Sequence, residues 1–312
     1  MNRWRSAPWS LVLALSLAWL LAPPFASVSS ASEIAILKSS DLSAYNQAVE
    51  GFRSAAANDN LTFREYDLEG DLERGRKLAR RIRASDAALV LAVGVKAALA
   101  AKLEVLDVPV VYCLVLDPDK YDLSASNVSG ISLEVPPVQQ FSTMKAILPK
   151  LKRIGVLYDP SKSARLMQEA TMVAKQQGLE LLAQPVSSER ELPPMLRSLL
   201  PLVDALWLIP DTTVLSEESL PFILQESLDA NRSVFGFSSE FVKRGALLGI
   251  SVNYRDIGKQ AARLSRRILD RQVVPPIKAV PDHFTLTLNL KTARFLGLDI
   301  PPEIERRADE RY

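Results

Sequence analysis

The stretch 87-AALVLAVGVKAALAAKL-103 contains the transition that decides the fold. An apolar run, residues 87–93, ends at the turn Gly94-Val95-Lys96, and a helix-like pattern begins in that turn. A short apolar run bounded by a turn is typical of a strand buried on both faces, and strands that alternate with helices form parallel sheets covered by helices. The stretch therefore predicts a β-strand followed by a helix in an α/β protein.

The same transition recurs along the chain. Four further apolar runs end in a short polar turn that opens a helix-like pattern, namely residues 34–37, 110–116, 154–158 and 205–209. The turns that follow them are Lys38-Ser39-Ser40-Asp41, Asp117-Pro118-Asp119, Asp159-Pro160-Ser161 and Pro210-Asp211-Thr212. In open parallel sheets, ligands bind outside the carboxyl ends of the strands. We therefore predict that function lies in the turns and not in the apolar runs.

Two series of alternating strands and helices follow one another, with a boundary near residues 131–135. A late helix pattern, residues 254–271, and a late strand, residues 284–289, fit if the chain crosses back to the first lobe and then returns to the second. The pattern predicts two similar Rossmann-like lobes with parallel sheets, joined by three crossover segments. The predicted lobes comprise residues 32–130 with 253–280, and residues 131–252 with 281–312.

The first 31 residues have the pattern of a secretory signal peptide. Arg3 and Arg5 form a basic segment, residues 11–22 are apolar, and Ser29 and Ala31 stand at the −3 and −1 positions of a cleavage site. An earlier cut and an uncleaved membrane anchor are the alternatives, although the apolar run is shorter than the ~20 residues that span a bilayer. We expect an exported, periplasmic protein.

Composition argues against several function classes. The chain carries 38 Lys and Arg against 36 Asp and Glu, and removal of Arg3 and Arg5 with the signal would leave 36 of each. A neutral chain without a basic block lacks the charge that nucleic acids require. Because Cys113 and His283 are the single cysteine and the single histidine, neither a disulfide nor a His/Cys metal site is available. Nucleotide-loop and nucleophile-elbow motifs are missing from the sequence.

We therefore predict no enzyme, no metal and no cofactor, with a hydrolase that uses only carboxylates as the open alternative. Binding asks for less: helix N-termini can hold an anion, aspartates can hold an ammonium group, and aromatic side chains can form an apolar wall. The predicted ligand-binding residues are Ser39, Ser40, Tyr45, Gly94, Val95, Asp117, Asp159, Ser161, Asp211, Thr212, Ser238 and Tyr254. An ordinary helix cap is the alternative for the serines and aspartates, and a core role is the alternative for the tyrosines.

Four segments resemble one known family. They are residues 288–302, LNLKTARFLGLDIPP, followed by Arg307-Ala308-Asp309-Glu310; residues 107–112 with Asp117-Pro118; residues 127–132; and residues 154–160. Together they are similar to the bacterial ABC-transporter substrate-binding proteins with a periplasmic-binding-protein type I fold, a family that includes aromatic-amino-acid binders. The resemblance covers most of the chain after residue 31, and its C-terminal motif is the most specific part.

The resemblance implies two lobes that close over a small-molecule ligand, with an amino acid as the first guess. It also implies a monomer that performs no chemistry and delivers the ligand to an ABC permease in the inner membrane. Two departures stand out: residues 121–126 replace a Pro-Gly-Gly turn expected at the cleft mouth, and Asp159 stands where the family has asparagine. The alternative is a sensory module that docks on a membrane receptor or a histidine kinase. A DNA-binding regulator would need a helix-turn-helix where the signal-like segment lies.

Overall fold

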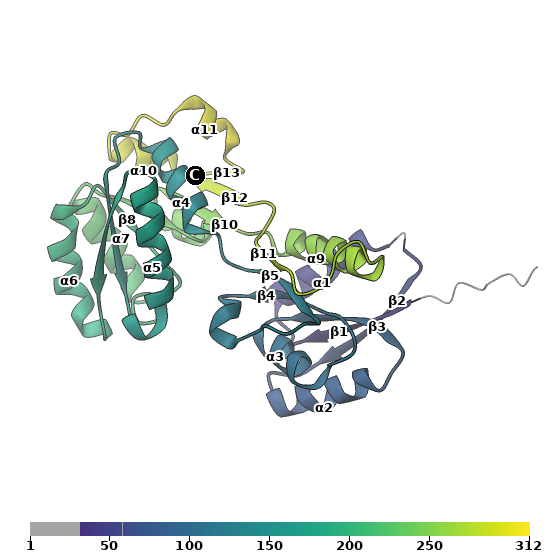
Figure 1. The fold of residues 1–312 in the computed structure, drawn as a ribbon. Coiled ribbons are helices and arrows are strands. Elements are labelled where there is room, and N and C mark those ends of the chain that lie inside the picture. The colour runs from purple at the N-terminus through teal and green to yellow at the C-terminus, as the bar shows by residue number, and fades with distance from the viewer. Residues whose placement is uncertain (1–31, 58) are drawn as a thin grey trace, which may run out of the picture.

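The computed structural model describes residues 32–57 and 59–312, so the predicted signal segment lies outside the described residues. The described chain forms two lobes, each built on one sheet with helices on both faces (Figure 1). This arrangement confirms the predicted α/β fold of two lobes. We call the lobe that contains β1 the N-lobe and the lobe that contains β13 the C-lobe.

The N-lobe sheet has the strand order β11-β5-β4-β3-β1-β2, and all of its paired strands run parallel. Its strands are β1 (Ser32–Lys38), β2 (Leu61–Asp67), β3 (Ala87–Val93), β4 (Val110–Val115), β5 (Val128–Ser132) and β11 (Lys278–Ala279). Its helices are α1 (Ser43–Ala55), α2 (Leu72–Arg83), α3 (Val95–Glu104), the 3-10 turn η1 (Pro118–Tyr121) and α9 (Tyr254–Leu269).

Alternation of side chains along β1 explains the two helical layers of the N-lobe. Ile34 and Ile36 are fully buried in the cluster that includes α1 and α9, whereas Ala35 and Leu37 are fully buried in the cluster that includes α2 and α3. Successive side chains of a strand point to opposite faces, so a strand that is apolar throughout needs helices on both sides. The apolar run that marks β1 in the sequence therefore also determines its central place in the sheet.

The C-lobe sheet has the strand order β13-β12-β10-β9-β8-β6-β7. Its strands are β6 (Arg153–Tyr158), β7 (Glu180–Pro185), β8 (Ala205–Trp207), β9 (Ser233–Gly236), β10 (Leu248–Ser251), β12 (Thr285–Leu288) and β13 (Glu310–Arg311). Strand β12 pairs antiparallel with β10 and parallel with β13, so these two edge strands run against the other five. The prediction of parallel sheets is correct for the remaining strands, and the edge pair departs from it because the chain enters β12 directly from the third crossing.

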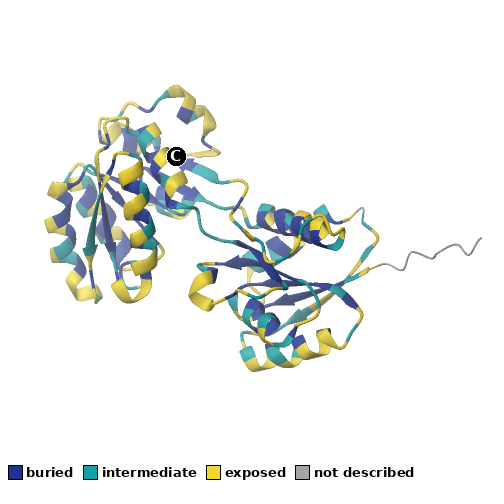
Figure 2. Cartoon of the chain, viewed as in Figure 1, coloured by how far each residue is buried: buried dark blue, intermediate teal, exposed yellow. Residues whose placement is uncertain are grey.

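Helices cover both faces of the C-lobe sheet as well. They are α4 (Pro137–Ile147), α5 (Pro160–Gln176), α6 (Leu192–Leu199), α7 (Ser219–Asp229), α8 (Ser239–Lys243), α10 (Leu290–Phe295) and α11 (Pro302–Arg307), with 3-10 turns η2 (Glu189–Glu191) and η3 (Leu200–Leu202). Buried residues concentrate in the strands at the centre of each lobe (Figure 2). Phe141 of α4 packs edge-on against Trp207 of β8, with ring centroids 5.0 Å apart. Each lobe thus has its own core.

The chain passes between the lobes three times: between β5 and α4, between β10 and α9, and between β11 and β12. After the second crossing, α9 packs against α1 of the N-lobe, far from it in sequence (Figure 1). The two helices approach so closely that an ideal Cβ on Gly258 would lie 1.9 Å from the Ala48 carbonyl oxygen, and one on Gly51 would lie 2.0 Å from that of Arg255. Two glycines therefore allow the contact that anchors the second crossing.

Candidate functional site

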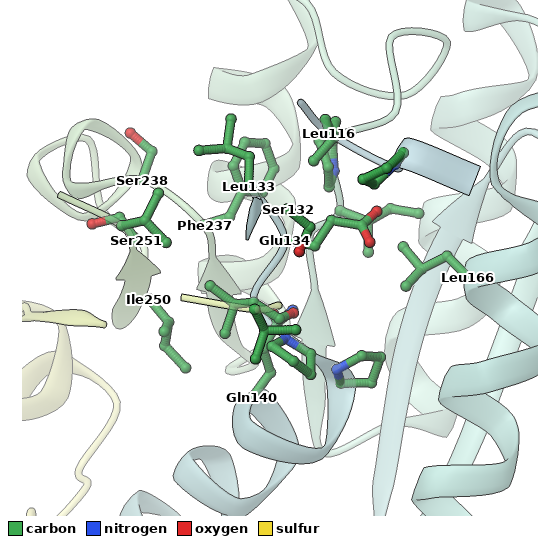
Figure 3. A pocket seen from close by; sticks show the side chains of 18 of the residues that line it. Leu116, Ser132, Leu133, Glu134, Gln140, Leu166, Phe237, Ser238, Ile250 and Ser251 are labelled. Atoms are coloured by element: carbon green, nitrogen blue, oxygen red, sulfur yellow. The ribbon is translucent and has the colours of Figure 1, made fainter. Parts of the chain in front are cut away.

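A cavity of about 710 Å³ lies between the two lobes (Figure 3). All three crossings line it, through residues 132–137, residues 250–252 with Tyr254, and residues 278–280. The C-lobe adds the ends of β8 and β9, and the N-lobe adds the end of β4 and the start of η1. A concave site of this size, with apolar walls and a few polar groups, is typical of small-molecule binding.

A second cavity of about 260 Å³ adjoins the first on the N-lobe side. Three tyrosines and several aliphatic side chains line it, including Tyr45, Tyr121, Tyr254, Leu114, Leu116 and Leu133. Tyr254, Leu116 and Leu133 line both cavities, so the two form one continuous surface. Burial raises the pKa of the Tyr45 phenol because water no longer solvates the phenolate. This part of the cleft suits an apolar or aromatic group.

The turn residues of the N-lobe hold one another in place. Gly94 has a φ of +86°, and a Cβ there would lie 2.6 Å from the Ser39 hydroxyl oxygen and 2.7 Å from the Tyr45 ring. The Ser39 hydroxyl accepts a hydrogen bond from the backbone N–H of Ala97 at 3.0 Å, in the first turn of α3. Ser39 and Gly94 thus fix the start of α3 and the position of Tyr45, while Tyr45 itself faces the small cavity.

The aspartates of the C-lobe form a separate network. Asp159 accepts hydrogen bonds from the Thr213 hydroxyl at 2.6 Å and from the Ser161 hydroxyl and N–H at 2.7 and 2.9 Å. These bonds, with that from Thr213 first, lower the pKa of Asp159 because they favour the carboxylate. Asp211 accepts from the backbone N–H of Asp159 at 2.8 Å. Both carboxylates are therefore engaged within the C-lobe.

An ion pair joins the two lobes beside the large cavity. Asp117, in the turn after β4, accepts from the Nη2 and Nε atoms of Arg165 on α5 at 2.6 and 3.3 Å. The same guanidinium lies 3.6 Å from Glu134 of the first crossing and 3.9 Å from Glu169. Burial, followed by the negative charge of Asp117, raises the pKa of Glu134, and Arg165 opposes this only in part. Asp117, which was predicted to accept an ammonium group of the ligand, is therefore already paired with Arg165.

The structure brings four of the twelve predicted residues to the cavities. Ser238 and Tyr254 line the large cavity, and Tyr45, Val95 and Tyr254 line the small one. The other eight do not line either cavity in the described chain, namely Ser39, Ser40, Gly94, Asp117, Asp159, Ser161, Asp211 and Thr212. The last of these accepts a hydrogen bond from Lys162 at 2.7 Å.

Several lining residues escaped the sequence interpretation. Glu134 and Leu133 belong to the first crossing, and Gln140 follows it on α4, where its side-chain oxygen accepts from the indole N–H of Trp207 at 2.7 Å. The lobe boundary predicted near residues 131–135 was the available signal, because a hinge segment necessarily borders the interlobe cleft. No feature of the sequence points to Arg165, because its position in the predicted helix is typical of an exposed surface residue.

Residues 32–57 and 59–312 contain no group of three or more His, Cys, Asp or Glu side chains arranged to hold a metal ion. Over the same residues, none of the helices combines the length and the hydropathy needed to cross a bilayer.

Comparison with known proteins gives concordant findings. A model of the family described as ABC transporter substrate binding protein matches residues 33–312. A tyrosine-binding protein of Clostridioides difficile is 24% identical over 249 residues, which cover 77% of this chain and 72% of that protein. Among solved structures, a ligand-free, open substrate binding protein with adhesive properties from Clostridium difficile has a TM-score of 0.77 at 22% identity, covering 89% of this chain and 98% of that one. A Streptococcus pneumonia domain in complex with L-Trp has a TM-score of 0.62 at 22% identity, covering 91% and 100%.

Proposed function

The chain belongs to the ABC transporter substrate binding protein family, and from this premise we propose that it captures a small ligand between its lobes and delivers it to an ABC permease. The observation that carries the proposal is the large cavity, which both lobes and all three crossings line. A cavity placed at the crossings changes shape when the lobes move, so its occupancy and the lobe angle are coupled.

Binding would work by closure. A ligand stabilises the closed form only through contacts that it makes there and lacks in the open form. Exposed apolar side chains at the cleft, such as Leu116 at 38% and Tyr121 at 37%, give closure additional surface to bury.

We propose an amino acid with an apolar or aromatic side chain as the ligand. The names of two similar proteins refer to tyrosine and to L-Trp, and the three tyrosines of the small cavity suit such a side chain. Of the predicted residues, Tyr45, Val95, Ser238 and Tyr254 would contact the ligand, while Ser39 and Gly94 would position Tyr45.

Export to the periplasm completes the proposal. Cleavage after residue 31 would leave a neutral chain of two lobes, with residues 32–130 and 253–280 in one and residues 131–252 and 281–312 in the other. Cells that lack this protein should lose ligand uptake. Expression of the full chain should restore uptake, and expression of a chain without residues 1–31 should not. This result would support delivery from outside the inner membrane. Unchanged uptake in the deletion strain would count against it.

Calorimetric titration of residues 32–312 with L-tyrosine, L-tryptophan, L-leucine, a sugar and a nucleoside tests the ligand class. A ligand present at 100 times its Kd should stabilise the protein by about 2.7 kcal/mol in a parallel thermal scan. Tyr254→Ala should weaken binding at least tenfold, because its ring lines both cavities. Phe295→Ala removes a ring that is 71% exposed on α10 and should leave binding unchanged. Binding of the sugar or the nucleoside in place of any amino acid would refute the ligand class.

A further inference from the structure

Glu134 is the carboxylate that the first crossing brings into the large cavity. It lies among the lining side chains shown in Figure 3, with Ser132 and Leu133 on one side and Leu166 on the other. The next residues, Val135, Pro136 and Pro137, lead into α4, and proline fixes the backbone φ angle. The side chain is 29% exposed in this structure, so it is accessible to a ligand but already partly desolvated.

The charge of Glu134 is only partly compensated by the protein. Arg165, its cationic neighbour at 3.6 Å, already donates two hydrogen bonds to Asp117 and also faces Glu169. Within the described residues, no hydrogen bond to the Glu134 carboxylate is present. Its raised pKa agrees with this geometry, because burial and the neighbouring negative charges outweigh the attraction of the guanidinium.

The other charges of the cavity do not provide a cationic partner for Glu134. Asp119 is paired with Lys278, and both belong to the N-lobe. Three carboxylates therefore share the single guanidinium of Arg165: Asp117, Glu134 and Glu169. Lobe closure expels water from the cleft, and a carboxylate that loses water without gaining a cationic or hydrogen-bonding partner is costly. A ligand that brings a positive charge to Glu134 removes this cost.

The surface next to Glu134 identifies the rest of the ligand. Leu133, its neighbour in sequence, lines both cavities, and the small cavity beyond it is walled by Tyr45, Tyr121 and Tyr254. A carboxylate beside an aromatic pocket fits a molecule with a protonated amine close to an apolar or aromatic body. We propose that Glu134 is the specificity-determining residue that selects ligands by their ammonium group, an inference that rests on the proposed amino-acid-binding function.

Deaminated analogues test this proposal directly. The wild-type protein should bind L-tyrosine and L-tryptophan at least tenfold more tightly than 3-(4-hydroxyphenyl)propionate and 3-(indol-3-yl)propionate. Glu134→Gln should abolish most of that preference by weakening binding of the amino acids while leaving the analogues unchanged or slightly improved. Glu134→Asp keeps a carboxylate and should retain part of the preference.

Glu303→Gln is the matched control, because it removes the same charge from an exposed position on α11 that lines neither cavity. Its preference for the amine should stay within about twofold of wild type. Equal loss in both variants would show a general effect of charge and overturn the proposal, as would an unchanged preference in Glu134→Gln. Failure of the wild type to bind any amino acid would instead refute the proposed function, and the inference with it.

A pH titration adds a readout that a purely structural role would not change. Glu134 binds an ammonium group as a carboxylate, so affinity should fall as the pH is lowered through its raised pKa, by up to about tenfold per pH unit. The groups that face it are Asp117, Asp119, Arg165 and Glu169. Glu303→Gln should keep this slope and Glu134→Gln should lose it; a slope that persists in Glu134→Gln would contradict the proposal.

Discussion

Replacement of Gly258 by alanine should loosen the helix pair that anchors the second crossing. The added Cβ would lie 1.9 Å from the Ala48 carbonyl oxygen and 2.9 Å from the Phe52 nitrogen, closer than the 3.0 Å below which real Cβ atoms are essentially never found. Both obstacles belong to the backbone of α1, so no side-chain rotation relieves them. The helices must separate by about 1 Å, and a gap of 0.5–1 Å already forfeits roughly a quarter to a half of a van der Waals contact.

The expected cost follows from two opposing effects. Overpacking of a well-packed contact costs about 1–3 kcal/mol, and obstacles that are backbone atoms of α1 place this site at the upper end. Alanine is favoured over glycine in a helix interior by about 1 kcal/mol, which offsets part of that cost. We expect a net loss of about 2 kcal/mol from the N-lobe, or roughly 6 °C in its Tm.

Two spectroscopic signals separate the lobes in this experiment. In a protein of residues 32–312, Trp207 is the single tryptophan, and it is buried in the C-lobe core. Circular dichroism should therefore show the lowered N-lobe transition, while the fluorescence transition of Trp207 should move little. Because Tyr254 begins α9 and lines both cavities, ligand affinity should fall as well.

Gly75→Ala on α2 is the matched control. Its Cβ would lie 2.4 Å from Cδ2 and 2.7 Å from Cγ of Leu68, which are side-chain atoms that can shift without moving a helix backbone, so its cost should be smaller than that of Gly258→Ala. An N-lobe transition that is unchanged in Gly258→Ala, or lowered equally in Gly75→Ala, would refute the argument from backbone approach.

Three further outcomes are expected. Asn253→Ala removes the side-chain oxygen that accepts hydrogen bonds from the N–H groups of residues 255 and 256 at 3.0 and 3.2 Å, at the start of α9. The free energy of unfolding, measured by chemical denaturation, should fall by about 1 kcal/mol. An unchanged free energy would argue against a stabilising helix cap at Asn253. Burial raises the pKa of the Cys113 thiol to about 12, so Ellman's reagent at neutral pH should label one thiol only after unfolding. The pKa of Asp159 is lowered in the folded protein, so its carboxylate stabilises the fold above the pKa of a free aspartate, and this contribution is lost as the pH falls through the folded pKa. Thr213→Val removes the first hydrogen bond that lowers this pKa, so stability should fall less steeply with decreasing pH. An acid denaturation curve unchanged from wild type would contradict a stabilising role for the Thr213 hydrogen bond.

Local pattern was sufficient for the architecture. The apolar runs at residues 34–37 and 87–93 became central strands because a strand without a polar face must be covered on both sides. The direction of β12 and β13, which run against the other strands of the C-lobe sheet, could not be predicted in the same way, since it depends on where the third crossing delivers the chain. The sequence alone also indicated the family, through its C-terminal motif.

The candidate site divides along the same line. Strand-to-helix turns are recognisable from residue order and include Val95 and Ser238, whereas Tyr45 and Tyr254 were predicted as aromatic side chains for an apolar wall. Which polar groups in those turns remain free depends on contacts across the fold: Asp159 and Asp211 are engaged with each other's turns, and Asp117 is held by a guanidinium from the other lobe.

The amino-acid order therefore determined two lobes of alternating strands and helices, because burial and turn chemistry act over a few neighbouring residues. Only the tertiary structure decided that the crossings line the cavity and that Glu134 shares Arg165 with Asp117. Those groups lie far apart in sequence, and their interaction energies depend on distance and burial, which the placement of one lobe against the other sets.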